Sequence, residues 1–166
     1  MPYSSIVKTK RDGTLQFEDN AAAHTLAVAF EAGDFSLNIP EEAVNLFLDR
    51  GSIGSPPAIR YGDDQPITGS FTAYLRDLSD ATYATLEEIL LQSGYVGSTW
   101  VSTMGATGEV FTLTLRWTIE GTNHGDATDH VITLPYCHVS GSLSEGDPDM
   151  ISINFTCYAV RPTVVS

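Results

Sequence analysis

Basic residues are scarce in this chain of 166 residues. Eight lysines and arginines stand against 21 aspartates and glutamates, which gives a formal net charge of −13 at pH 7. A surface with this balance repels the phosphates of a nucleic acid and releases few of its counterions. We therefore do not expect stable binding of DNA or RNA, although an acidic protein can let nucleic acid pass nearby without retaining it.

Charged residues of both signs together are also few. They make up 17% of the chain, whereas about 25% is usual in a soluble protein. Much of the surface must then be Ser, Thr, Gly and Asn, or be covered by other chains.

Long apolar runs and cysteines are the other two scarcities. No run approaches the roughly 18–20 residues of a membrane span, and the first 13 residues, MPYSSIVKTKRDG, lack the apolar core of a secretory signal. We expect synthesis in the cytosol and no membrane partner. Cys137 and Cys157 are too few for a disulfide scaffold and lack the spacing of a zinc site, so both are expected to be reduced and buried.

The length and the alternation of residue types predict one mainly β domain over residues 1–166. Apolar and polar residues alternate over residues 66–75, 110–120 and 150–161, the period of a strand with one buried face. The last strand is predicted to pair with residues 130–144 about a turn centred near Asp147, which places Cys137 close to Cys157. With no βαβ rhythm, the pattern predicts a β-sandwich or barrel.

A single flanking helix is predicted from about Asp80 to Gln92. Ser79 or Asp80 is suited to cap its start, and Gly94 stands where a left-handed C-terminal cap is expected. The glycine-punctuated residues 94–108 are interpreted as a loop or an irregular strand.

Residues 41–65 predict an extended arm, made of a strand followed by a long loop. This segment combines apolar residues with glycines and paired prolines, and a long loop inside a compact domain is usually functional or disordered. Apolar side chains on such an arm need a cover, which we expect a neighbouring subunit to supply. The residues concerned are Leu46, Phe47, Leu48, Ile53 and Ile59.

Catalytic and ligand motifs are not apparent, so neither an enzyme, a metal nor a cofactor is expected. The chain contains no G-x-S-x-G and no G-x-x-x-x-G-K. Cys137 and His138 are adjacent in a predicted strand and therefore point to opposite faces. The remaining polar clusters match no recognised ligand loop or facing carboxyl pair, and are interpreted as solvated loops; they are His124, Asp126, Asp129 and His130, the pair Asp147 and Asp149, and the neighbours Glu41–Glu42 and Asp63–Asp64.

The two tryptophans are assigned different environments. Trp117 lies on the apolar side of its strand and is expected in the core. Trp100, in a segment rich in glycine and serine, is the candidate for a contact surface.

The order of these features is similar to that of the major tail tube proteins of long-tailed bacteriophages. The resemblance covers most of the chain, and it is carried by a predicted hairpin over residues 4–18, the arm, the strand–helix passage ITGSFTAYLRDLSDATYATLEEIL and the final hairpin GSLSEGDPDMISINFTCYAV. It implies a structural protein of the virion tail, with a two-sheet sandwich flanked by a helix. Homo-hexameric rings would stack into a tube through which DNA is ejected without specific binding. It also implies a tape measure protein and tail terminator or baseplate proteins as partners, and no catalytic residues. The family is related in fold to the tubes of contractile injection systems, including the type VI secretion tube.

In a tube of this kind, the inner strands show one face to the channel. The polar faces of the strands that alternate best are the candidates for the lumen, where hydroxyls and negative charge would let DNA slide. Thr68, Ser70 and Thr72 form one such face. The strands over residues 110–120 and 150–161 are favoured because their alternation is longest, and their candidates are Thr112, Thr114, Thr118, Glu120, Ser152, Asn154 and Thr156.

Two alternatives remain open. A β-sandwich module that binds a glycan or a host surface would need an exposed aromatic or metal-lined platform. A viral ring adaptor or decoration protein would assemble without extending into a tube.

Overall fold

Strands dominate the computed structural model, which describes residues 13–28, 34–41, 43–47, 58–75, 83–105, 107–122, 125–158 and 161–165. The predicted mainly β class is confirmed, with a large antiparallel sheet and a small second sheet. The elements are β1 (Gly13–Glu18), β2 (Thr25–Val28), β3 (Ser36–Asn38), β4 (Val44–Phe47), β5 (Ala58–Tyr61), β6 (Ile67–Tyr74), α1 (Leu86–Leu91), α2 (Gly94–Thr99), β7 (Leu113–Ile119), β8 (His130–Ser144), β9 (Met150–Cys157) and β10 (Thr163–Val165).

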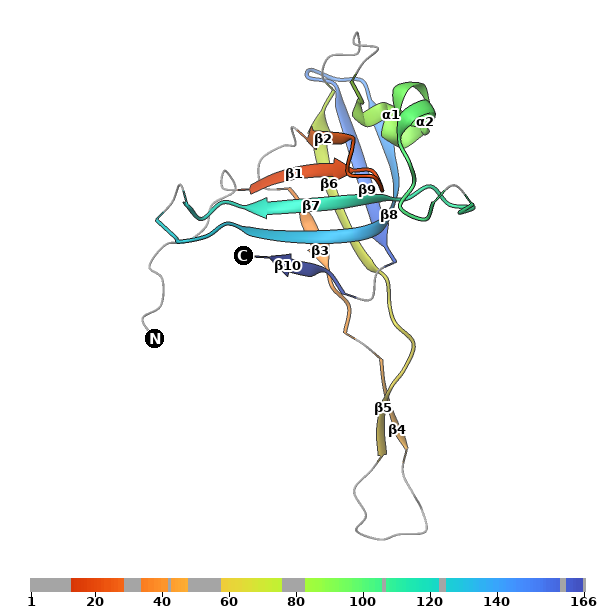
Figure 1. The fold of residues 1–166 in the computed structure, drawn as a ribbon, viewed down its shortest axis with the longest axis vertical. Coiled ribbons are helices and arrows are strands. Elements are labelled where there is room, and N and C mark those ends of the chain that lie inside the picture. Colours follow the sequence, from red (N-terminus) through yellow and green to blue (C-terminus); the bar gives the residue numbers. More distant parts are fainter. Residues whose placement is uncertain are drawn as a thin grey trace.

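The large sheet is one continuous sheet folded into two layers. Its order is β2-β1-β7-β8-β9-β6-β3, and β10 also pairs with β8. β7 and β10 pair with the first part of β8, up to residue 134, and β7 has one further partner at Cys137. β9 pairs with the second part of β8, residues 137–144. One layer therefore contains β2, β1, β7, β10 and the first part of β8, and the other contains the second part of β8 with β9, β6 and β3. The strands of the two layers run in crossing directions (Figure 1).

A bulge in β8 separates its two parts. Leu113 and Leu115 of β7 lie opposite Cys137 and Leu134, so two residues of β8, Pro135 and Tyr136, stand against one of β7. Tyr136 has a φ of 57°. An extra residue of this kind bends a strand and sharpens its twist. The predicted strand over residues 130–144 is confirmed, but it bends here and contributes to both layers.

The core lies between the two layers, where the rings of Phe17 and Phe71 have centroids 6.2 Å apart. Ile89 of α1 and Val96 of α2 are buried with them, and the two helices lie beside the upper part of the sandwich in Figure 1. Along β6 and β9 the buried residues alternate as the sequence predicted. The strand residues of the core are Leu15, Phe17, Val28, Ile67, Phe71, Ala73, Leu113, Leu115, Leu134, Cys137, Val139, Ile151, Ile153, Phe155 and Cys157.

The tryptophan assignments are half right. Trp117 packs against the core, with its ring centroid 4.9 Å from that of Phe35, as expected. Trp100 is only 6% exposed, so its prediction as a contact residue is wrong. Its backbone N–H donates to Val96 at the end of α2, and its ring stacks on His24 at a centroid distance of 6.2 Å. The preceding helix thus positions a ring that the local Gly/Ser composition had suggested was exposed.

The helical region differs from the single predicted helix. Residues 83–85 are not helical, α1 begins after Thr85, and a second helix follows where a loop was predicted; Ser79 and Asp80 lie outside the described residues. Gln92, with a φ of 51°, ends α1, while Gly94 begins α2. Glu88 accepts a hydrogen bond from the backbone N–H of Tyr95 at 3.0 Å, which satisfies a donor in the first turn of α2. Packing, not helix propensity, stabilises this second helix.

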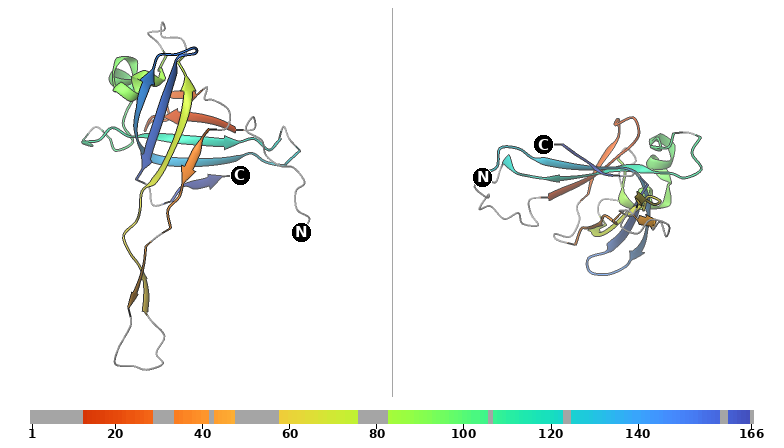
Figure 2. Two further views of the ribbon diagram at one scale, coloured as in Figure 1. Left: turned by 180° about the vertical axis from the view of Figure 1, so that it is seen from behind. Right: turned by 90° about the horizontal axis from the view of Figure 1, so that it is seen from below.

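The arm projects from the sandwich as a hairpin in which β4 and β5 pair (Figure 2). Both sides are strands, whereas a strand and a loop had been predicted. Leu46, Phe47 and Ile59 lie in these strands, and Leu48 and Ile53 fall outside the described residues. The predicted hairpin over residues 4–18 is described only from Gly13 onward, where β1 pairs with β2 and β7.

Candidate functional site

One outer face of the sandwich carries uncharged polar side chains in rows across four strands. These outward-facing positions of β3, β6, β9 and the second part of β8 are register partners, and we call them the hydroxyl face. Ser36 and Ser70 in one row have hydroxyl oxygens 2.9 Å apart. The rows are Ser36–Ser70–Asn154–Ser140, Asn38–Thr68–Thr156–His138 and Thr72–Ser152–Ser142.

Charged side chains are missing from these rows, which contain no Asp, Glu, Lys or Arg. Acidic residues gather instead at the turn between β8 and β9, where Glu145, Asp147 and Asp149 are exposed. The carboxylate of Asp149 accepts a hydrogen bond from the N–H of Gly146 at 2.8 Å and so closes the turn. The negative charge that we expected along a polar face therefore lies at one end of it.

The outer face of the other layer is charged. Arg116 of β7 and Glu18 of β1 form an ion pair at 2.7 Å on this face. Thr114 and Thr118 lie on the same side of β7, opposite Glu18 and Thr14 of β1. The two strands with the longest alternation, predicted over residues 110–120 and 150–161, thus belong to different layers. Their polar residues cannot form one surface, because the bulge in β8 divides the sheet between them.

Thr112 does not belong to either outer face. It is 2% exposed, and its hydroxyl lies 2.6 Å from that of Thr103. Its backbone N–H donates to the Ser102 hydroxyl at 3.1 Å. The prediction that Thr112 lines a lumen is therefore wrong, since the segment before β7 is covered by residues 102–103. Glu120 follows β7 and is half-buried.

The layer with the hydroxyl face has strand edges on both sides that no described strand occupies. β3 pairs with β6 alone, and beyond Cys137 the second part of β8 pairs with β9 alone among the described strands. Such edges present backbone N–H and C=O groups to a further strand. Two residues before β3 begins, the carboxylate of Asp34 accepts a hydrogen bond from the N–H of Thr72 at 2.6 Å, in place of a strand partner.

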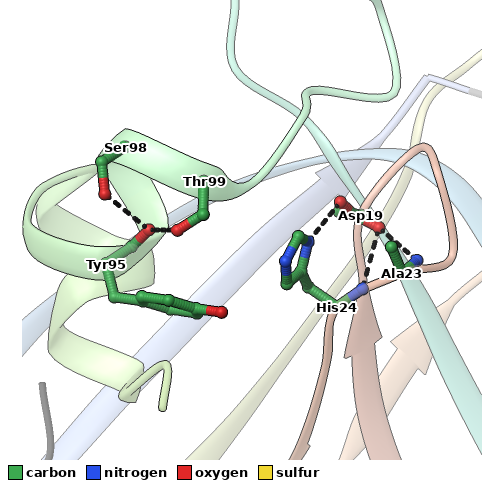
Figure 3. Close-up of polar contacts among 6 residues, drawn as sticks. All are labelled: Asp19, Ala23, His24, Tyr95, Ser98 and Thr99. Carbon is green, nitrogen blue, oxygen red and sulfur yellow. Dashed lines mark hydrogen bonds and ion pairs between the residues drawn. The ribbon is translucent and has the colours of Figure 1, made fainter. Parts of the chain in front are cut away.

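A buried carboxylate braces the turn between β1 and β2 (Figure 3). Asp19 is 3% exposed and accepts hydrogen bonds from the N–H of Ala23 at 3.0 Å and from Nδ1 of His24 at 2.9 Å. Burial opposes the ionisation of Asp19, but the hydrogen bonds from His24 and Ala23 outweigh it and lower the pKa. The His24 ring in turn contacts Tyr95 of α2 edge-on, at a centroid distance of 5.9 Å. Nothing in the sequence distinguished Asp19 from the other acidic residues.

One of the polar clusters weighed in the sequence contains a carboxylate that closes its own loop. Asp129 accepts hydrogen bonds from the N–H groups of Gly121 and Thr122 at 2.8 and 2.9 Å, and thereby closes its loop. His124 lies outside the described residues, and within them no group of three or more His, Cys, Asp or Glu could hold a metal ion. Cys137 points into the core, and the imidazole of His138 lies on the opposite face, 3.3 Å from the Phe111 carbonyl oxygen, as predicted.

Membrane-spanning helices are not found in the described part of the chain, since neither helix is long or apolar enough to cross a bilayer.

Comparison with known proteins gives a likeness of fold. No family model matches the sequence, and no curated protein matches it either. A chain from the structure of an extracellular contractile injection system, the PVC sheath/tube terminator in its extended state, is 10% identical with a TM-score of 0.58, over 100% of this chain and 99% of that one. A chain from the 6-fold symmetrised baseplate of the anti-feeding prophage is 9% identical with a TM-score of 0.56, over 100% and 98%. The chain thus has a fold found in tail-type injection systems. The likeness does not single out a major tube protein of long-tailed phages.

Proposed function

We propose that the chain is a structural, non-catalytic component of a tail or tail-like injection particle, in which copies close into a hexameric ring around a channel. The observation that carries this proposal is the hydroxyl face, which is flanked on each side by a strand edge that no described strand occupies. If β3 of one copy pairs with the second part of β8 of the next, both edges are satisfied. A ring closed in this way leaves neither edge of this layer free for aggregation.

The hydroxyl face is the surface that we propose lines the channel. Ser152, Asn154 and Thr156, three of the candidates from the sequence, lie on it. Its rows contain no lysine or arginine that could hold a phosphate, so nucleic acid would pass with little retention. The face with the Arg116–Glu18 ion pair would then lie on the outside of the ring. Passage of DNA during ejection is the transport that this lining suits.

The arm is proposed to lie against a neighbouring subunit. Val44 and Tyr61 at its base are 59% and 76% exposed, and both line an open hollow of about 570 Å³. Apolar side chains in such an exposed position indicate a surface that another chain covers. Leu46, Phe47, Leu48, Ile53 and Ile59 extend this apolar character along the arm in the sequence.

A single ring is the second form that the proposal can take. The two solved chains compared above come from structures described as a terminator and a baseplate. In this form the chain would cap or join a tube, whereas as a tube protein it would stack ring on ring around a tape measure protein. The glycan-binding alternative has lost its best residue, because Trp100 is buried.

Native mass spectrometry and negative-stain microscopy of concentrated protein test the proposal. The expected result is hexameric rings, and stacked rings would favour the tube over the terminator. Deletion of residues 52–58 in the arm should leave a folded monomer, checked by circular dichroism, that no longer assembles. A wild-type protein that stays monomeric at every concentration would contradict ring formation, and rings formed by the deletion variant would contradict the role of the arm.

A further inference from the structure

Cys137 and Cys157 are direct partners across β8 and β9. Both carry a thiol that is not in a disulfide, and both are 0% exposed. The backbone N–H of Tyr158 donates to the carbonyl of Tyr136 at 3.3 Å, so the adjacent pair is the hydrogen-bonded one. The cysteines therefore occupy a non-hydrogen-bonded position, where Cα atoms are about 4.5 Å apart. This separation falls within the roughly 4.4–6.8 Å that a disulfide spans.

Both thiols also contact the bulge that bends β8. Sγ of Cys137 donates to the carbonyl of Leu134 at 3.2 Å, and Sγ of Cys157 donates to that of Pro135 at 2.8 Å. Cys137 lies opposite Leu113 of β7 as well, so it sits where strands of the two layers meet. The pair is thus placed at the corner that joins the layers.

We propose that Cys137 and Cys157 form a redox-sensitive pair, which we call the clasp. A peroxide oxidises the two thiols to a cross-strand disulfide, and this bond stabilises the corner that joins the two layers. In the reduced state, the two S–H groups satisfy carbonyl oxygens of the bulge. In the first step, the thiolate of one cysteine attacks a peroxide oxygen and becomes a sulfenic acid, and hydroxide leaves. In the second step, the other thiol attacks that sulfur and water leaves. Two thiols and one hydrogen peroxide thereby give one disulfide and two waters.

The buried environment of the two thiols makes formation of the disulfide slow. Contact with the Cys157 thiol and burial raise the pKa of Cys137, so little thiolate is present in the folded protein. Reaction then depends on brief opening of the corner. The inference does not depend on ring assembly.

Oxidation of the native full-length chain by hydrogen peroxide tests the clasp. After the peroxide is quenched, the protein is denatured without reductant, alkylated and weighed intact. We expect two alkyl groups before treatment and none after it, with no covalent dimer on a non-reducing gel. The melting temperature should rise by about 5 °C and return after reduction. C137S and C157S keep a hydroxyl donor for the bulge, cannot form the bond, and should show no such rise.

Two results would overturn the clasp. The first is that both thiols of the native protein remain open to alkylation under conditions that oxidise the same protein in denaturant. The second is that the disulfide forms but leaves the melting temperature unchanged or lower, which would mean that the bond strains the corner.

Discussion

Gly69 offers a perturbation that tests the packing of the layer with the hydroxyl face. It lies opposite Phe155 of β9 and Leu37 of β3. A Cβ added here would lie 2.3 Å from Cζ of Phe155 and 2.4 Å from the carbonyl oxygen of Ser36. Phe155 is 1% exposed and its ring stacks on Phe35 at 6.1 Å, so it has little freedom to turn away. G69A therefore forces a movement of β3, of β9 or of both.

The stability lost in G69A depends on which neighbouring strand, β3 or β9, can move more easily. Overpacking of this kind costs about 1–3 kcal/mol, and about 2–4 °C of melting temperature corresponds to each kcal/mol in a chain of this length. β3 is held by three register pairs, whereas β9 pairs along its whole length on both sides. We expect G69A to lower the melting temperature by roughly 2–12 °C and to release β3 from the edge of the sheet.

Hydrogen exchange measured by mass spectrometry resolves this outcome. In G69A, residues 36–38 should lose protection while β8 and β9 keep theirs, and ring assembly should fail because the edge proposed to meet the next copy is gone. G146A is the matched control, since its added Cβ would meet nothing closer than 3.2 Å in an exposed turn. In an F155L background, G69A should lower the melting temperature by less. The remaining decrease would come from the contact of the added Cβ with the Ser36 carbonyl. A G69A protein as stable as wild type, with β3 still protected, would refute the register.

Further substitutions test the buried Asp19 carboxylate and the two outer faces. D19N removes the buried carboxylate and should cost about 1.5–3 kcal/mol of unfolding free energy at pH 7. The folded pKa of Asp19 lies below its usual value of 3.8, so its contribution to stability is present above that pH and is lost as pH falls through the folded pKa. In urea unfolding, the difference in unfolding free energy between wild type and D19N should therefore become smaller in acid. A difference that stays constant with pH would contradict this. S140K/N154K places two lysines on the hydroxyl face, and preassembled rings should then retain linear duplex DNA at low salt, with release by added salt. Covalently closed circular DNA, which cannot enter a channel, should not be retained. T114K/T118K, on the other layer, should show no preference for linear over circular DNA in the same binding assay, and the same preference in both variants would contradict the assignment of the faces.

Strand periodicity was enough to predict most of the sheet. The strand expected over residues 66–75 is β6 (Ile67–Tyr74), and the expected final hairpin is β8 with β9. The cysteine pairing followed from the same hairpin, because a turn near Asp147 fixes the register. These features depend on local alternation and on turn residues, which a single sequence displays directly.

Features that depend on contacts between distant segments were not predictable in the same way. The bulge at Pro135–Tyr136 is defined by the register against β7, and only this register assigns the polar sides of β7 and β9 to different layers. Thr112 alternates correctly but is covered by residues 102–103, and Trp100 is buried because α2 turns it inward. Six of the eleven residues in the rows of the hydroxyl face were therefore predicted as polar positions on two single strands, β6 and β9. Its continuity across β3, β6, β9 and β8 required the pairing.

Electron cryo-microscopy of concentrated protein tests the central claim most directly. We predict a ring of six copies in which β3 of one copy pairs with the second part of β8 of the next. Ser140, Ser152 and Asn154 should face the channel, with Arg116 on the outside. Monomers at every concentration, or a ring whose channel is lined by the Arg116–Glu18 face, would contradict the account.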